Sequence, residues 1–215
     1  MSFTLYPGCT IQNRTPFLEA STRFVFEKLG IALKDGDFNC CPNPVGVKMY
    51  DKMTWYTLAG RNLAVAEAEK SDVMSLCNGC FQTMFMVDHD LKKDPILKDE
   101  VNKHLSKINK EYKGTVNIRH FVHVLFNDIG VDKIKAQVTK PLTGLKVAAH
   151  PGCHYARPSH VLNTDDPFKP VHLKELIKAS GATLVEYHCE TLCCGQLVRN
   201  QDEKVANGIL KTKMD

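Results

Sequence analysis

Cysteines are the residues of this chain whose type, number and spacing could do chemistry. The chain has nine of them in 215 residues. In a reducing compartment this usage indicates metal or redox chemistry rather than structural disulfides. The odd count and the two adjacent pairs also fit a disulfide framework poorly. The nine are Cys9, Cys40, Cys41, Cys77, Cys80, Cys153, Cys189, Cys193 and Cys194.

The first group of thiols comes from three places along the chain: Cys9, the pair Cys40-Cys41, and the motif Cys77-x-x-Cys80. Thiolates are soft ligands that select iron-sulfur clusters, zinc or copper(I), and the spacing favours iron-sulfur over structural zinc. Zinc and a simple cubane cluster each need four thiolates, whereas this group has five. Either one cysteine is a spectator, or the metal centre is larger or less regular than a single cubane.

A thiol redox site is a third interpretation of the same residues. The motif Cys77-Asn78-Gly79-Cys80 stands between a predicted strand and a predicted helix, which is the layout of thioredoxin-like motifs. The presence of Cys9 and Cys40-Cys41 in the same group, and the repetition of this pattern in a second copy, favour metal ligation instead.

That second copy is visible residue by residue. The second copy of Tyr6-Pro7-Gly8-Cys9 is His150-Pro151-Gly152-Cys153, and the second copy of Asn39-Cys40-Cys41 is Leu192-Cys193-Cys194. The separation within each copy is similar, with 30 residues between Cys9 and Cys40 and 39 between Cys153 and Cys193. A repeat of ligand positions predicts two similar sites on two related lobes.

Alternating strand and helix signals must position these thiols. The expected strands are 3–6, 72–76, 116–118 and 145–149. The expected helices are 16–29, which begins after Thr15 and ends at Gly30, then 49–68, 81–90 and 120–129. Residues 91–112 are expected to form a lysine-rich, solvated helical insertion.

The expected fold is therefore α/β, with two pseudo-symmetric Rossmann-like lobes. Each lobe is a small parallel sheet flanked by helices, with metal ligands at the C-terminal ends of its strands, as open α/β sheets deliver them. The first lobe is expected over residues 1–140 and the second over 141–215, with the boundary in the segment 139–144.

Composition excludes several other classes. The charge of +4 comes from 28 basic and 24 acidic residues spread along the chain, without the basic block of a nucleic-acid-binding tail. No segment approaches the roughly 18 apolar residues of a membrane span, and the N-terminus has no signal-peptide pattern, so we expect a cytoplasmic protein. Glycine-rich nucleotide motifs are absent from the sequence, so we expect no flavin or NAD on this chain.

The cysteine pattern resembles the CCG cysteine-rich domain family, and the Pro-Gly-Cys openings and the length resemble the members of that family that serve as the B subunit of heterodisulfide reductase in methanogens. The resemblance covers essentially the whole chain. It implies a noncubane [4Fe-4S] cluster at each complete five-cysteine set. The ligands implied for the first cluster are Cys9, Cys40, Cys41, Cys77 and Cys80, and those for the second are Cys153, Cys193 and Cys194.

The resemblance also implies an activity, reduction of the coenzyme M–coenzyme B heterodisulfide to two thiols in methanogenesis. The disulfide would lie between the clusters, with one sulfur captured on each side as electrons arrive singly. In the family pattern a final Cys-x-x-Cys should follow Cys194 by 36 residues, the separation of Cys41 from Cys77, but the sequence ends at Asp215. We therefore expect a second lobe truncated before its last ligands.

Further residues follow from this resemblance. His154, directly after Cys153, is a candidate proton donor to a departing thiolate. Coenzyme M carries a sulfonate and coenzyme B a phosphate, which arginine and lysine bind well. The candidates for substrate binding are Arg14, Arg157, Lys48 and Arg199. Cys189 and Trp55 are expected to be ordinary buried residues.

The partners that the resemblance implies are the two other core proteins of a heterodisulfide reductase and an electron source. Its C subunit is ferredoxin-like with ordinary [4Fe-4S] clusters, its A subunit carries FAD and [4Fe-4S] clusters, and a hydrogenase or formate dehydrogenase completes an electron-bifurcating complex. Two alternatives stay open. One is a CCG-domain electron-transfer subunit of another oxidoreductase, acting on lactate, glycolate, glycerol phosphate or a thiol-fumarate couple. The other is a non-enzymatic module stabilised by zinc.

Overall fold

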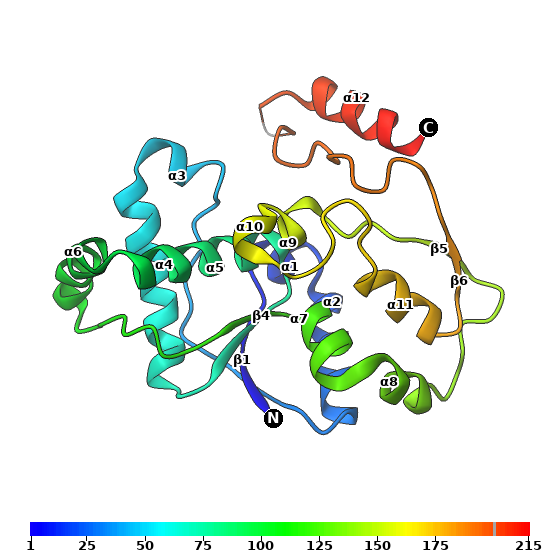
Figure 1. Cartoon of the computed structure of the whole chain (residues 1–215), viewed down its shortest axis with the longest axis horizontal. Coiled ribbons are helices and arrows are strands. Elements are labelled where there is room, and N and C mark those ends of the chain that lie inside the picture. The colour runs from blue at the N-terminus through cyan, green and yellow to red at the C-terminus, as the bar shows by residue number, and fades with distance from the viewer. Residues whose placement is uncertain (200) are drawn as a thin grey trace. The chain divides into compact units, whose positions relative to one another are not determined.

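The computed structural model describes residues 1–199 and 201–215, which fold into two compact units, Met1–Phe121 and Val122–Asp215 (Figure 1). The boundary expected from the cysteine repeat, between residues 140 and 141, lies inside the second of these units. The division into two lobes stays a prediction about the repeat.

A parallel sheet of four strands forms the centre of the first unit, in the order β2-β1-β3-β4. The strands are β1 (Ser2–Tyr6), β2 (Ala32–Lys34), β3 (Asp72–Ser75) and β4 (Ile118–His120). The chain leaves β1 for β2 on one side and then returns to β3 on the other side of β1. The carboxyl ends of β1 and β3 therefore flank a topological switch point, where open α/β sheets place their ligands.

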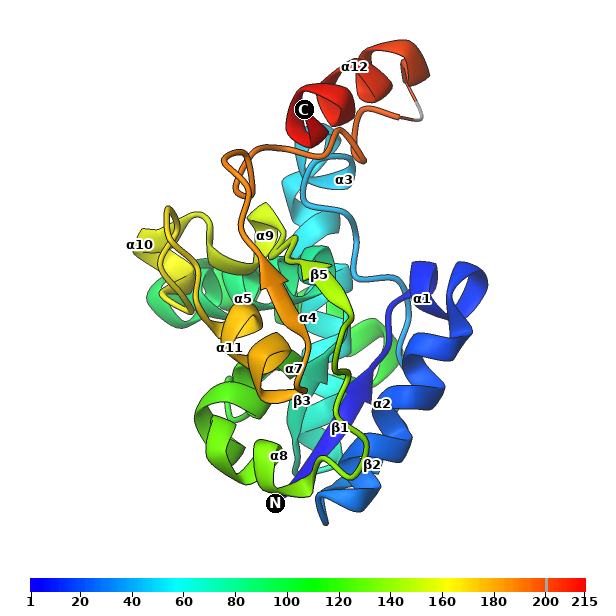
Figure 2. The ribbon, with the colours of Figure 1, turned by 90° about the vertical axis from the view of Figure 1, so that its right-hand side faces the viewer.

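Helices cover both faces of this sheet. They are α1 (Cys9–Arg14), α2 (Pro16–Lys28), α3 (Val47–Tyr50), α4 (Lys52–Ala68), α5 (Asn78–Lys93) and α6 (Pro95–Leu105), followed by a 3-10 turn, η1 (Ser106–Ile108). Helix α2 lies on the opposite side of β1 from α4 (Figure 1 and Figure 2). The start of α2 at Pro16 and its end before Gly30, whose φ is +72°, confirm the sequence expectation.

The helix expected over 49–68 is divided at Asp51. Its carboxylate accepts hydrogen bonds from the backbone N–H groups of Met53 and Thr54, 2.9 and 3.3 Å away, and so caps a new helix, α4. Trp55 and Leu63 of α4 are completely buried, so this helix forms much of the core, as expected for Trp55.

Helix α6 lies in the lysine-rich segment expected to be solvated, and the helical part of that expectation is confirmed. Its apolar side is nevertheless core, because Val101 and Leu105 are fully buried. A Cβ on Gly60 of α4 would lie 3.2 Å from Val101 Cγ1, so the missing side chain lets the two helices approach closely. The charged residues of this segment cover the outer side of a packed helix.

The second unit has a smaller parallel sheet, with β5 (Lys146–Ala148) beside β6 (Thr183–Val185) in Figure 2. Its helices are α7 (Phe121–His123, beginning at the unit boundary), a π-helix η2 (Val124–Gly130), α8 (Val131–Gln137), α9 (Cys153–Ala156), α10 (Ser159–Leu162), α11 (His172–Ala179) and α12 (Glu203–Met214). Among the described residues this unit has two strands where the first has four. The fold is thus mixed α/β with small parallel sheets flanked by helices, and a pseudo-symmetric pair of Rossmann-like lobes is not confirmed.

Within the two described ranges, no helix combines the length and apolar character needed to cross a bilayer.

Candidate metal centre

The thiols of the first unit lie at the carboxyl edge of its sheet. Cys9 is the first residue of α1 and directly follows the Pro7-Gly8 turn at the end of β1. Cys77 follows β3 and precedes the first turn of α5, which holds Cys80. The remaining two, Cys40 and Cys41, lie in the loop after β2. The chain therefore reaches the same edge of the sheet three times, after β1, β2 and β3, and brings five thiols there, as the sequence predicts.

These thiols lie near one another. The Cys40 thiol interacts with those of Cys9 and Cys41, and the Cys80 thiol interacts with those of Cys41 and Cys77. Contact with Cys41, then contact with Cys77, and then burial raise the pKa of Cys80. Burial, followed by its thiol neighbours, raises the pKa of Cys40. A cation would reverse this balance, because metal ligation favours the thiolate.

The five thiols are gathered without forming a coordination shell. In the part of the chain that the structure describes, no three His, Cys, Asp or Glu side chains are disposed around one metal position. The chemistry of the donors nevertheless fits a thiolate-bound centre, since soft sulfur ligands are those that iron-sulfur clusters and zinc share.

Tyr6 lies beneath this thiol cluster and is only 2% exposed. Its hydroxyl donates to the Asn39 carbonyl at 2.5 Å, and its ring packs on Phe38 with centroids 4.9 Å apart. Burial, and then negative charge on the neighbouring thiolates, Cys41 first, raise the pKa of Tyr6. The hydroxyl thus stays a hydrogen-bond donor that holds the loop before Cys40-Cys41. The sequence marked Tyr6 only as part of the repeated opening.

The loop that carries Cys40 and Cys41 is also held by the helices behind it. Asn62 of α4 is fully buried, and its Oδ1 accepts from the Asn39 N–H at 2.9 Å. Its Nδ2 donates to the carbonyls of Asn39 and Cys40, at 3.2 and 3.1 Å. Thr83 of α5 donates its hydroxyl to the Pro42 carbonyl at 3.1 Å. Sequence reasoning missed Asn62, which has no motif around it.

Gly8 shows why the repeated turn needs glycine. Its φ is +82°, and a Cβ there would lie 3.1 Å from Cys80 Sγ and 3.2 Å from Cys77 Cβ. The backbone must pass this close to deliver Cys9 beside the Cys77-x-x-Cys80 turn. Gly152 adopts nearly the same conformation, with φ 80° and ψ 129° against 82° and 143° for Gly8. The Pro-Gly-Cys repeat is therefore a repeat of local geometry.

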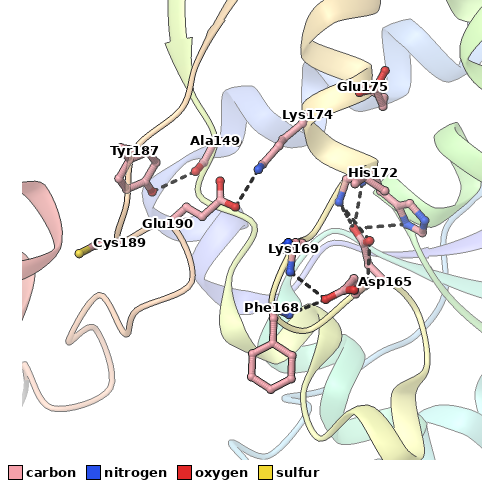
Figure 3. Close-up of polar contacts among 12 residues, drawn as sticks. Ala149, Asp165, Phe168, Lys169, His172, Lys174, Glu175, Tyr187, Cys189 and Glu190 are labelled. Carbon is pink, nitrogen blue, oxygen red and sulfur yellow. Dashed lines mark hydrogen bonds and ion pairs between the residues drawn. The ribbon is translucent and has the colours of Figure 1, made fainter.

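The second unit places Cys153 at the start of α9, and Cys193 and Cys194 in the segment between β6 and α12. The stretch that leads to Cys153 and the stretch that leads to Cys193-Cys194 are the two arms of the second site. Tyr187 connects these arms, because its hydroxyl donates to the Ala149 carbonyl at 2.9 Å (Figure 3). Cys189 is partly exposed and lies in the same segment as Cys193. The expectation that it is an ordinary buried residue is therefore not matched by its exposure.

Hollows beside the thiols are small. One of about 230 Å³ is lined by residues that include Tyr6, Cys9, Gln12, Arg23 and Cys40. The guanidinium of Arg23 is already paired with Glu19, at 2.8 Å, and with Asp35. Its charge is therefore committed to carboxylates.

The predicted substrate-binding cations differ in their surroundings. Arg14 is exposed in the last turn of α1, and the Lys48 ammonium lies 4.4 Å from the centre of the Trp55 ring. Arg199 pairs with Glu203 at 3.1 Å on the surface. The Arg157 guanidinium donates to the carbonyls of Pro167 and Thr191. Most N–H donors of the Arg157 guanidinium are therefore bound to backbone carbonyls, so of these four side chains it has the fewest donors left for an anion.

His154, the predicted proton donor, lies in α9 immediately after Cys153 and is partly buried. Neither its role nor the binding roles of the four cations is tested by their positions, so these stay predictions.

Comparison with known proteins adds to this geometry. The family model CCG, described as "Cysteine-rich domain", matches residues 3–85 and 147–215. These two ranges contain all nine cysteines.

Several curated proteins are similar over most of the chain. The B subunit of ferredoxin:CoB-CoM heterodisulfide reductase from Methanosarcina mazei is 40% identical over 89% of this chain, which spans 64% of that protein's length. A protein of Archaeoglobus profundus, named for its likeness to the B subunit of heterodisulfide reductase, is 36% identical over 100% of this chain and 73% of its own. The 8-methylmenaquinol:fumarate reductase membrane anchor subunit of Wolinella succinogenes is 28% identical over 98% of this chain and 74% of its own.

A solved structure shares the fold. The crystal structure of a hypothetical protein from Helicobacter pylori superposes with a TM-score of 0.67, at 14% identity, over 92% of this chain and 35% of that one.

Proposed function

Because the chain belongs to the CCG cysteine-rich domain family, we propose that it is the iron-sulfur B subunit of a heterodisulfide reductase, reducing the coenzyme M–coenzyme B heterodisulfide. The observation that carries this proposal is the convergence of five thiols at the carboxyl edge of the first sheet. The relatives whose names refer to the B subunit of heterodisulfide reductase support it. The coarser conclusion, an iron-sulfur reductase or electron-transfer subunit, follows from the family and those relatives together.

The proposed cofactors are two noncubane [4Fe-4S] clusters, and this chain carries no flavin or NAD. Cys9, Cys40, Cys41, Cys77 and Cys80 would hold the first, while Cys153, Cys193 and Cys194 would contribute to the second. When bound, such clusters supply single-electron steps at iron. The overall reaction adds two electrons and two protons to one disulfide and yields two thiols.

The chain's own residues have defined tasks in this scheme. Asn62 and Tyr6 fix the backbone of the Cys40-Cys41 loop, and Gly8 lets Cys9 approach Cys77 and Cys80. His154 would supply a proton to one product thiolate. Arg14, Lys48 and Arg199 would attract the sulfonate and phosphate of the substrate, with Arg157 contributing less because its donors are bound to backbone.

Electrons would come from other proteins of the complex in the cytoplasm. The proposed partners are the C subunit with its [4Fe-4S] clusters and the A subunit with its FAD, linked to a hydrogenase or formate dehydrogenase in a bifurcating complex. The relatives' names describe subunits of larger reductases, which supports a chain that works within an assembly.

A second function has one observation in its favour. The chain is 28% identical to a subunit that is named for a fumarate reductase, which is a reductase of another substrate. The chain would then be a CCG-domain electron-transfer subunit of a different oxidoreductase.

The test is anaerobic expression of the chain, followed by assay of heterodisulfide reduction with a reduced viologen as donor. Consumption of viologen that depends on the heterodisulfide, and produces two thiols for each disulfide, supports the first function. An iron-sulfur protein whose clusters accept electrons from the reduced viologen, and which leaves the heterodisulfide intact, supports the second. A zinc protein without sulfide contradicts both.

A further inference from the structure

Lys213 is a buried cation that neither the cysteine pattern nor the family resemblance marks. It lies in the last turn of α12 and is 3% exposed. Its ammonium donates to the carbonyls of Cys189, Glu190 and Leu192, at 2.8, 2.7 and 3.2 Å. An ammonium has three donors, so all of them serve one short segment of backbone. That segment leads directly into Cys193 and Cys194.

Neighbouring contacts extend this anchor to the other cysteine arm. The Lys213 ammonium lies 5.2 Å from the centre of the Tyr187 ring, and the Tyr187 hydroxyl donates to the Ala149 carbonyl. Ala149 stands just before the turn that delivers Cys153. Figure 3 shows Tyr187 directed at Ala149, and Glu190 directed at Lys174. The Lys174 ammonium lies 2.7 Å from the Glu190 carboxylate. The two arms of the second site are thereby tied together through Lys213 and Tyr187.

The charge of Lys213 has thiols around it. The thiols of Cys194, Cys189 and Cys153 and the Glu190 carboxylate lie close enough to interact electrostatically with this ammonium. Glu190 is already paired with Lys174. A buried cation is costly unless an anion balances it, and the remaining candidates for that anion are the thiolates. A metal-thiolate centre carries this kind of charge.

We propose that Lys213 is a positioning residue of the second thiolate site, where it fixes the backbone before Cys193-Cys194 and serves as the buried counter-charge of the metal-thiolate centre. The inference rests on the proposed function, because it assumes that Cys153, Cys193 and Cys194 hold metal. It goes beyond that function by assigning a residue outside the cysteine motif.

The test compares three variants of the full chain, purified anaerobically. Lys213→Met removes the charge and the donors, and Lys213→Arg keeps the charge. Lys211→Met is the matched control, because Lys211 lies on the same helix and is exposed. Each folded protein is treated with iodoacetamide, and labelling is measured at every cysteine by mass spectrometry. Bound thiolates resist alkylation, so labelling reports metal occupancy at each site without an activity assay.

Lys213→Met should increase labelling of Cys153, Cys193 and Cys194 by about tenfold, the equivalent of one lost charge-assisted hydrogen bond. The five cysteines of the first unit should keep their wild-type protection, which shows that the variant is folded. Lys213→Arg should restore part of the protection, and Lys211→Met should match the wild type.

Two results would overturn the inference. One is equal protection of the second set in Lys213→Met and wild type, and the other is a wild type in which only the first set is protected. If Lys213→Met exposes both sets, amide hydrogen exchange of α4 distinguishes global unfolding, and full exposure of the second set in Lys213→Arg then contradicts the proposal. A wild type without iron and with no protected cysteine would instead refute the proposed function itself.

Discussion

The two Cys-Cys segments are held by different chemistry. Asn62 holds the first with a neutral amide that both donates and accepts, whereas Lys213 holds the second with an ammonium that only donates. A neutral clamp fixes its loop whatever the charge of the thiols. A charged clamp is stabilised by thiolate charge nearby, so the second segment should respond to metal loading more than the first.

The two Pro-Gly-Cys turns, by contrast, are alike in the two units. Gly8 and Gly152 share nearly the same backbone angles, although one turn follows a sheet of four strands and the other a sheet of two. The ligand geometry is thus repeated more faithfully than the scaffold around it.

The largest effect should come from Gly8→Ala. The new Cβ would press on Cys80 Sγ, 3.1 Å away, at a φ of +82°, and the two costs together should destabilise the first unit by about 2–4 kcal/mol. Gly30→Ala is the control, because Gly30 has a φ of +72° but nothing within 4 Å of its Cβ position. Urea unfolding should show a clearly smaller loss for the control. Equal losses would mean that backbone strain alone matters and that crowding by Cys80 does not.

Asn62→Ala should have the next largest effect. It removes three hydrogen bonds to the first Cys-Cys loop, at about 1 kcal/mol each, so unfolding free energy should fall by about 2–3 kcal/mol. The exposed Asn13, which donates to the Cys9 carbonyl at 2.8 Å, gives the control Asn13→Ala, for which we expect little change. A fully stable Asn62→Ala protein with unchanged cysteine protection would show that the amide clamp is dispensable.

Tyr6→Phe should act more mildly. It keeps the ring packed on Phe38 and removes only the hydrogen bond to the Asn39 carbonyl, which is worth about 1 kcal/mol. Amide exchange in the loop before Cys40 should rise while the rest of the first unit keeps its protection. Unchanged exchange there would separate Tyr6 from loop positioning.

The smallest effect should be a loss of stability of the second unit in acid. Burial lowers the pKa of His172 from its usual 6.5, against the opposing charge of Asp165, and burial together with Lys213 lowers the pKa of His150. The unfolded chain therefore takes up these protons first. Stability is complete above pH 6.5 and is lost as the pH falls through the folded pKa values. Amide exchange of α11, corrected for the pH dependence of intrinsic exchange, should increase as the pH falls from 7 to 5. The His172→Asn variant should show a smaller increase. The same increase in the variant would assign the acid effect to other groups.

Local signals in the sequence were enough for the elements that deliver the thiols. The strand 3–6, the helix after Thr15 that ends before Gly30, and the strand before Cys77 all have clear apolar patterns or end signals. Because Cys9 follows β1 and Cys77 follows β3 closely, the meeting of these thiols at one sheet edge also followed from topology.

Other features had no local signal. Strands β2 and β6 have three residues each, too few to show a period. Asn62 and Lys213 are ordinary polar residues of helices, and their partners lie 21 to 24 residues away in the chain. In α6 the many lysines hid a signal that was present, the apolar pair Val101 and Leu105 at helical spacing.

The central claim is that the five thiols of the first unit hold an iron-sulfur centre. Iron, zinc and acid-labile sulfide should be measured on the same anaerobic samples of wild type, Cys41→Ser, Cys80→Ser and Cys189→Ser. We predict iron and sulfide without zinc in the wild type, a marked loss of both in Cys41→Ser and Cys80→Ser, and wild-type content in Cys189→Ser. Zinc without sulfide in the wild type, or iron content that survives both Cys41→Ser and Cys80→Ser, would contradict the claim.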